Sequence, residues 1–177
     1  MLDHRHFTKY MGRTDIDTLV LQIASEINRD YDGKTVVLIG VLKGSFMFMA
    51  DLIRALTVDA RVDFVKLTSV GKRKGSPGTV VFQKDLSVDL RGKHALIIEQ
   101  IIDSGRTLKF LYDRVKAAGP ESVEVVTLLD KTDKRMVETP VKYVGKKTKD
   151  QFLVGYGLDL EENARNLSEL YYLKYPN

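Results

Sequence analysis

The sequence contains no cysteine, which excludes disulfide bonds and thiolate chemistry and is compatible with a reducing compartment. It also lacks any apolar stretch near the ~18 residues that a membrane-spanning helix needs. The first residues, MLDHRHFTKYMGR, lack the apolar segment of a signal peptide. We therefore expect a cytoplasmic protein without membrane contact.

Histidine is scarce as well, and its three copies form no metal-ligand cluster of known spacing. No repeat, low-complexity tract or linker interrupts the 177 residues, so the length predicts a single domain over residues 1–177. With 44% hydrophobic and 29% charged residues, the composition is that of an ordinary globular protein. The net charge of +4 favours anionic ligands but does not by itself indicate a nucleic-acid partner.

Strand and helix patterns alternate along the chain. The continuous β-branched run at 35–42, TVVLIGVL, predicts a strand buried on both faces. Helices are predicted at 14–31, 46–56 and 106–118, and strands at 60–67, 79–83, 94–99 and 122–129, with shorter strand candidates at 141–144 and 151–156. This alternation predicts an α/β fold: a mostly parallel, twisted sheet flanked by helices.

One segment, SVGKRKGSPG at 69–78, fits neither pattern. Its glycines, proline and basic residues cannot form a core, so we predict a mobile loop.

Unusual polar residues follow the predicted strands. Ligands of open parallel sheets bind at the carboxyl ends of the strands. Lys43-Gly44, the segment 99–107, Asp130-Lys131 and the segment 156–159 all occupy such positions. We expect these four segments to build one site.

The turn Asp103-Ser104-Gly105-Arg106-Thr107, here called the phosphate turn, lies between a buried strand and a helix start. The helix offers unpaired N–H groups and the positive end of its dipole, and the glycine permits close approach of a ligand. These features favour a cradle for one phosphate monoester. On the turn alone, a capped helix start without a ligand explains the same residues equally well. The chain contains neither GxxxxGK[ST] nor the G-x-G-x-x-G spacing.

The stretch IIEQIIDSGRTL (97–108) resembles the signature of the phosphoribosyltransferases. That signature is an apolar strand, two acids, two apolar residues, Asp, and then Thr/Ser-Gly-x-Thr; only Gln100, where the second acid is expected, departs from it. The segments VLKGSFMFMADL (41–52), TLLDK (127–131) and FLVGYGLDLEENARNL (152–167) are similar to the 6-oxopurine branch, the hypoxanthine-guanine phosphoribosyltransferases. The resemblance covers nearly the whole chain in the same order and spacing.

The resemblance implies a type I phosphoribosyltransferase fold with a small hood formed by the N- and C-terminal segments. It further implies a purine salvage enzyme that transfers 5-phosphoribosyl from phosphoribosyl pyrophosphate to N9 of hypoxanthine, guanine or xanthine. The products would be the nucleotide (IMP or GMP) and pyrophosphate. Mg²⁺ would be the cofactor, and the family suggests a homodimer or homotetramer.

Roles for individual residues follow from the same resemblance. Asp103 would be the catalytic general base or acid at purine N7, whether or not it also caps the helix. The sugar and its 5-phosphate would be bound by Glu99, Gln100, Asp103, Ser104, Gly105, Arg106 and Thr107. Leu42, Lys43 and Gly44, here called the pyrophosphate loop, would bind pyrophosphate together with Ser69 and Arg165. In relatives the peptide bond before this lysine can be cis.

For the purine, Lys131 would donate to the 6-oxo group and so reject 6-amino purines. Phe152 would stack on the ring, although an aromatic residue in a strand is by itself more typical of a core. Leu153, through its backbone carbonyl, and Asp159 would complete the purine site. Glu99 and Asp159 would be the Mg²⁺ ligands.

Two departures from the family pattern leave alternatives open. Gln100 carries no charge, is a weak Mg²⁺ ligand and faces away from Glu99 on a strand, so we predict weaker substrate binding or a higher Mg²⁺ requirement. The loop 69–78 would close over the reaction, but Val70 replaces the tyrosine of relatives. One alternative is therefore a diverged nucleotide-binding homologue with weak activity. Another is an RNA-binding regulator using Lys72–Lys74 and Lys146–Lys149, but no interleaved aromatic residues accompany these clusters.

Overall fold

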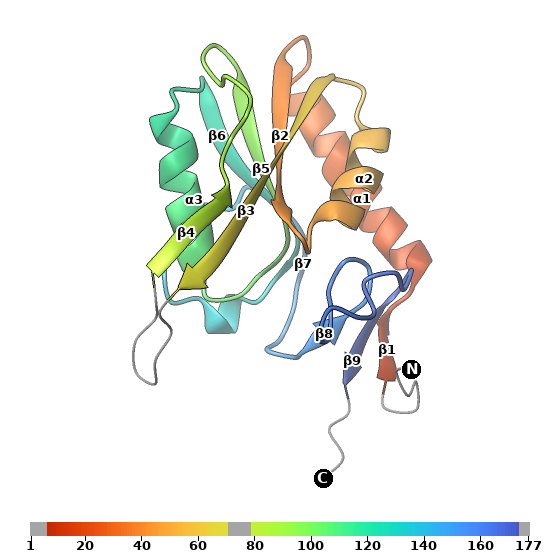
Figure 1. Ribbon diagram of the computed structural model, residues 1–177. Helices are drawn as coiled ribbons and strands as arrows, with labels where there is room; N and C mark the ends of the chain where they lie inside the picture. Colours follow the sequence, from red (N-terminus) through yellow and green to blue (C-terminus); the bar gives the residue numbers. More distant parts are fainter. Residues whose placement is uncertain (1–6, 71–78, 174–177) are drawn as a thin grey trace.

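The computed structural model describes residues 7–70 and 79–173, which form two sheets and three α-helices (Figure 1). The large sheet has the order β4-β3-β2-β5-β6-β7 and is parallel except for β4. Its strands are β2 (Thr35–Leu42), β3 (Asp59–Val70), β4 (Thr79–Lys84), β5 (His94–Ile102), β6 (Ser122–Asp130) and β7 (Tyr143–Lys147). The helices are α1 (Arg13–Asp30), α2 (Phe46–Ala55) and α3 (Arg106–Ala117), and a 3-10 turn, η2, covers Thr132–Lys134. The predicted α/β fold with a mostly parallel sheet is confirmed.

Helices cover both faces of the sheet because its central strands are apolar on both sides. Val36 and Leu38 of β2 pack with α1 and α2, whereas Val37 and Ile39 pack with α3. Figure 1 shows α1 and α2 on one side of the sheet and α3 on the other. None of the helices in the described ranges is long and apolar enough to cross a membrane.

The small sheet is the hood that the resemblance implies. It joins β1 (Phe7–Met11), β9 (Leu170–Leu173) and β8 (Leu153–Val154) in antiparallel pairing, so it unites the two ends of the chain. In Figure 1 it lies beyond the end toward which β2 points. Tyr156, directly after β8, is fully buried and donates a hydrogen bond of 2.6 Å to Asp51 of α2, which also pairs with Arg13 at 2.9 Å. These contacts tie the hood to α1 and α2.

Several element boundaries differ from the predictions. Strand β5 continues to Ile102 rather than ending at residue 99, because its pairing with β6 extends that far. Strand β3 reaches Val70 through pairing with β4, so Ser69 belongs to a strand and not to the predicted loop. The rest of that loop, 71–78, lies outside the described residues.

Near the C-terminus, the strand predicted at 141–144 is instead Tyr143–Lys147, since Val141 packs against the α3-side core without strand pairing. Of the candidate strand at 151–156, only Leu153–Val154 pairs. Both β1 and β9 went unpredicted.

Candidate active site

The carboxyl ends of β2, β5 and β6 bring the predicted segments together at one edge of the sheet. The backbone N–H of Lys131 donates to the carbonyl of Ile102 at 3.0 Å, which places the ends of β5 and β6 side by side. The Leu42–Lys43 peptide bond is cis, as it can be in relatives. A Cβ on Gly157 would collide with the carbonyl oxygen of Gly44, so the C-terminal segment lies directly against the pyrophosphate loop.

The phosphate turn leads into α3 through Gly105, which is the N-cap and has φ 82°. Only glycine adopts this left-handed conformation without steric penalty. Asp103 is therefore not the N-cap, and the reading of it as a helix cap is wrong. The first backbone N–H groups of α3 have no partner inside the helix, as at any helix start.

A cavity of about 230 Å³ opens beside this turn. Its lining residues are Glu99, Ile101, Ile102, Asp103, Ser104, Gly105, Thr107 and Leu108. Five of the seven residues predicted to hold the sugar phosphate thus share one cavity. Arg106 and Gln100 are not in its lining.

The segment 135–137 packs against the phosphate turn, a contact that the sequence did not predict. The carbonyl of Ser104 accepts hydrogen bonds from the N–H groups of Met136 (3.0 Å) and Val137 (3.2 Å). A Cβ on Gly105 would come within 2.5 Å of the Val137 carbonyl oxygen and 2.8 Å of Arg135 Cδ. Glycine is therefore needed here for space as well as for conformation.

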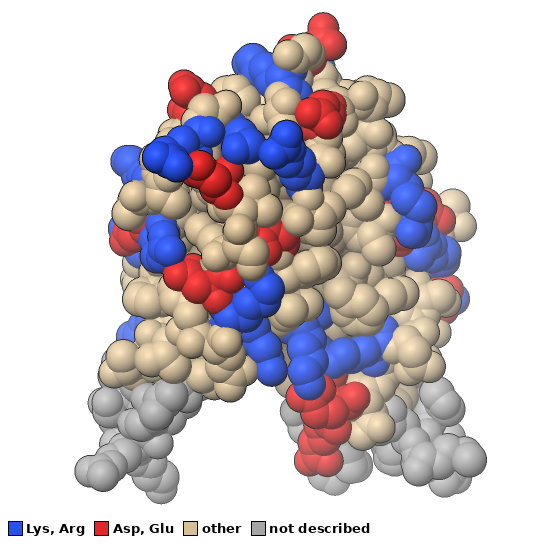
Figure 2. Space-filling view, turned by 45° about the horizontal axis from the view of Figure 1, so that its top comes forward, with Lys and Arg blue, Asp and Glu red and all other residues tan. Residues whose placement is uncertain are grey.

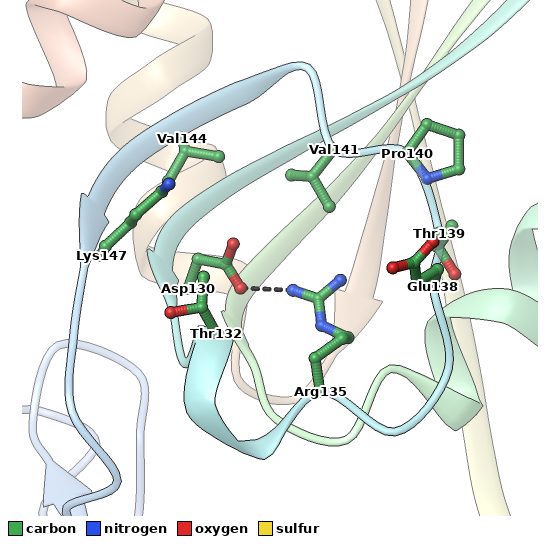
Figure 3. A pocket seen from close by; sticks show the side chains of 9 residues that line it. All are labelled: Asp130, Thr132, Arg135, Glu138, Thr139, Pro140, Val141, Val144 and Lys147. Atoms are coloured by element: carbon green, nitrogen blue, oxygen red, sulfur yellow. Dashed lines mark hydrogen bonds and ion pairs between the residues drawn. The ribbon is translucent and has the colours of Figure 1, made fainter.

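Arg135 also pairs with Asp130 at the end of β6, and both side chains are largely buried. Figure 3 shows this pair inside a second cavity of about 750 Å³. Its lining residues are Asp130, Thr132, Arg135, Glu138, Thr139, Pro140, Val141, Val144 and Lys147. Of these residues only Asp130 belongs to a segment expected at the site, so the larger cavity lies beside the predicted site, and the Asp130–Arg135 pair connects the two.

Glu99 is the most perturbed acid at the site. Burial raises the pKa of its carboxyl group to about 8, since water no longer stabilises the charged form. At neutral pH, Glu99 is thus mainly protonated in the protein alone. A ligand that needs the carboxylate must bring positive charge or hydrogen-bond donors to ionise it.

Gln100 lies on the other side of β5. It is 1% exposed, and among residues 7–70 and 79–173 neither its side-chain oxygen nor its nitrogen has a hydrogen-bond partner. Its Cβ is 3.8 Å from the place that a Cβ on Gly44 would take, so it packs beside the pyrophosphate loop. The structure therefore separates Gln100 from Glu99.

Among the predicted purine residues, Lys131 is buried and its Nζ lies 3.4 Å from Asp150 Oδ1. Asp150, which the sequence did not suggest, also pairs with Lys134 at 2.7 Å. Phe152 is 45% exposed, so its interpretation as a core residue is wrong and its ring is open to a ligand. The side chain of Leu153 is buried within β8.

The remaining predicted residues form a cluster of charges around the pyrophosphate loop. Arg165 donates to Gly157 O at 2.9 Å and pairs with Asp159 at 2.8 Å. Lys43 pairs with Glu162 at 2.8 Å, and the same carboxylate oxygen lies 3.1 Å from Arg165 Nη2. The two cations predicted to bind pyrophosphate therefore meet at Glu162, another residue not singled out from the sequence.

Comparisons with known proteins agree with this geometry. Residues 13–161 match the family model described as phosphoribosyl transferase domain. The chain is 41% identical to a Staphylococcus aureus hypoxanthine-guanine phosphoribosyltransferase (90% of this chain, 89% of the relative) and 38% identical to a Haemophilus influenzae hypoxanthine phosphoribosyltransferase (92% of each).

Solved structures give the same result. A crystal structure of a Staphylococcus aureus hypoxanthine phosphoribosyltransferase superposes with a TM-score of 0.93 at 39% identity, covering 98% of this chain and 97% of that one. A Trypanosoma cruzi hypoxanthine phosphoribosyltransferase mutant in a ternary substrates complex superposes with a TM-score of 0.90 at 35% identity, covering 96% and 97%.

The raised pKa of Glu99 predicts a specific dependence of stability on pH. Below the ordinary value of 4.5 the carboxyl group is protonated in both states, and above about 8 it is ionised in both. Between these values only the unfolded chain releases the proton, so each pH unit lowers the free energy of unfolding by up to about 1.4 kcal/mol. Glu99→Gln should lack this decline. Urea unfolding of both proteins from pH 5 to 8 tests this, and parallel pH profiles would contradict it.

The unpaired amide of Gln100 predicts that Gln100→Leu stabilises the protein. Leucine has a similar size, and removing a buried polar group without partners should raise the free energy of unfolding by about 1–3 kcal/mol. The control is Gln83→Leu on β4, where the glutamine is exposed and little change is expected. A loss of stability in Gln100→Leu, measured by urea unfolding, would show that the amide is paired.

Proposed function

The chain belongs to the phosphoribosyltransferase family, and from this premise we propose that it is a purine salvage enzyme of the hypoxanthine-guanine type. It transfers 5-phosphoribosyl from phosphoribosyl pyrophosphate to N9 of a 6-oxopurine and releases pyrophosphate. The observation that carries the proposal is the cavity at the end of β5, because Glu99, Asp103 and other residues of the phosphate turn line it together. Anion-binding and purine-facing groups flank it.

The phosphate turn holds the 5-phosphate. Backbone N–H groups at the start of α3 and the hydroxyls of Ser104 and Thr107 are donors, and the helix dipole favours the negative charge. The support from residues 135–137 keeps this backbone in place before the substrate arrives, so little ordering is needed on binding.

Glu99 and Asp103 act on the sugar and the base. Once ionised, Glu99 accepts hydrogen bonds from the ribose hydroxyls. Asp103 is exposed at the end of β5 and takes the proton from, or shares it with, purine N7, which makes N9 more nucleophilic. Lys43 and Arg165 stabilise the charge of the departing pyrophosphate.

The purine lies between Lys131 and Phe152. Lys131 donates to the 6-oxo group, and its partner Asp150 limits the directions in which the ammonium group points. The exposed ring of Phe152 stacks on the base. A 6-amino purine offers this ammonium group no acceptor in place of the 6-oxo oxygen, which is a strong basis for rejection.

The carboxyl groups present fit Mg²⁺. No group of three or more ligating side chains occurs among the residues that the structure describes, which suits an ion that keeps waters and substrate oxygens as ligands. Glu99, partly buried and with a raised pKa, gains most from a nearby cation, and Asp159 pairs with Arg165, one of the proposed pyrophosphate cations. Mg²⁺ bound with the substrate supplies positive charge to the leaving group.

By analogy with the family, we also propose a single domain over residues 1–177, a cytoplasmic location and a homodimer or homotetramer.

The RNA-binding alternative gains no support. Lys146 lies 5.2 Å above the ring of Tyr10, and on the face shown in Figure 2 basic and acidic side chains are interspersed. The cluster Lys72–Lys74 lies outside the described residues.

A base panel tests the function and the role of Lys131 together. The wild type should convert hypoxanthine and guanine, but not adenine, in the presence of phosphoribosyl pyrophosphate and Mg²⁺. Lys131→Met should reduce the preference for hypoxanthine over adenine in kcat/KM by about 10²-fold or more, because the donor is lost. Lys134→Met is the control, since this lysine also pairs with Asp150 but is exposed. If the wild type forms no nucleotide from any base, the proposed function is wrong. If Lys131→Met keeps the wild-type preference for hypoxanthine, only the role of Lys131 is wrong.

The role of Asp103 predicts that Asp103→Asn lowers kcat by about 10²–10⁴-fold, the usual contribution of a general base. Affinity for the nucleotide product should stay close to that of the wild type, because the phosphate turn is intact. Asp113→Asn makes the same change of charge on the exposed surface of α3 and should leave kcat unaltered. Steady-state kinetics and calorimetry with IMP give the two quantities, and near-normal kcat in Asp103→Asn would exclude the base role.

A further inference from the structure

Glu162 joins the two cations assigned to pyrophosphate. Its Oε2 atom lies 2.8 Å from Lys43 Nζ and 3.1 Å from Arg165 Nη2. Lys43 follows β2 and Arg165 belongs to the C-terminal segment, so the shared oxygen links two parts of the chain that are distant in sequence. A carboxylate oxygen that accepts from both a lysine and an arginine has the chemistry of a phosphate oxygen.

The backbone around Glu162 is built to present this carboxylate. Glu161, Glu162 and Ala164 have positive φ values of 49°, 66° and 69°, which residues other than glycine adopt only with a steric penalty. Reciprocal hydrogen bonds between Leu160 and Asn163 of 3.1 and 2.9 Å close the turn. The N–H of Glu162 also donates to Asp159 Oδ2 at 2.9 Å. The backbone at Glu162 therefore has a defined conformation, from which the side chain reaches both cations.

The two ion pairs are nevertheless easy to open. The side chains of Lys43 and Glu162 are 49% and 64% exposed, and water and salt screen ion pairs between exposed side chains. A pyrophosphate group, with more charge and more oxygens than one carboxylate, competes well for the same donors. The two ion pairs of Glu162 therefore orient the cations, and pyrophosphate can still displace the carboxylate.

We propose that Glu162 is a built-in counter-anion for the pyrophosphate cations. In the protein without substrate, its carboxylate takes the place of a pyrophosphate oxygen between Lys43 and Arg165. Pyrophosphate displaces it on binding, and Glu162 pairs again with the cations when pyrophosphate leaves. Glu162 is thus a positioning residue that weakens pyrophosphate affinity and sets the KM for phosphoribosyl pyrophosphate. This inference rests on the proposed function, because it takes Lys43 and Arg165 as the pyrophosphate ligands.

The test compares Glu162→Gln with Glu161→Gln. Both variants remove one negative charge from the same turn, but within the described part of the chain no ion pair links Glu161 to another side chain. Calorimetry with inorganic pyrophosphate and Mg²⁺ should give a dissociation constant about two- to tenfold lower for Glu162→Gln than for the wild type, the range expected for two exposed pairs. Glu161→Gln should change it by less than about twofold.

Steady-state kinetics supply an independent readout. In Glu162→Gln the KM for phosphoribosyl pyrophosphate should fall, whereas the KM for hypoxanthine should not change, since Lys131 and Phe152 are untouched.

Pyrophosphate binding in Glu162→Gln that is unchanged, weaker, or equal to that in Glu161→Gln would overturn the counter-anion role while leaving the enzyme's function intact. A wild-type protein that neither binds pyrophosphate nor forms nucleotide would instead overturn the proposed function, and the inference with it.

Discussion

A side chain at residue 157 would collide with the carbonyl oxygen of Gly44, and this close approach of two backbones is the constraint on which the site depends. Through this contact, the segment after β8, which contains Gly157, packs against the pyrophosphate loop after β2. Because the two segments touch at the backbone, Glu162 comes within ion-pair distance of Lys43 and also pairs with Arg165. The hood is thereby joined to the sheet at the place where the leaving group is expected.

A second backbone contact of the same kind forms the other half of the site. Gly105 fits between the strand–helix junction and residues 135–137, where any Cβ would meet the Val137 carbonyl oxygen. Backbone packing therefore positions both elements that we propose to bind anions, and charged side chains complete them. Two acids lie where substrate groups are expected. Within the described residues no ion pair involves Glu99, whereas Glu162 pairs with Lys43 and Arg165.

Features with a local cause could be predicted from the sequence. The run at 35–42 predicts a strand buried on both faces, and the order strand, Asp, Ser, Gly and helix predicts a turn that opens a helix. The turn alone does not distinguish a phosphate cradle from a helix start without a ligand. Strands β1 and β9 could not be predicted because each is short and stable only through its pairing with the other end of the chain. The partners of Arg135, Lys131 and Lys43 are set by tertiary contacts, and Glu162 is 119 positions from Lys43. For Gln100 the strand period predicts the opposite face to Glu99, but not that its amide meets no partner there.

The central claim is that the pyrophosphate loop, the phosphate turn and the segment 157–165 act as one site on one substrate. Amide hydrogen exchange during a titration with phosphoribosyl pyrophosphate and Mg²⁺ tests this most directly. The account predicts that peptides covering 42–46, 103–108 and 157–165 gain protection together, with the same midpoint concentration. Protection of the phosphate turn alone, or midpoints that differ between the three segments, would contradict it.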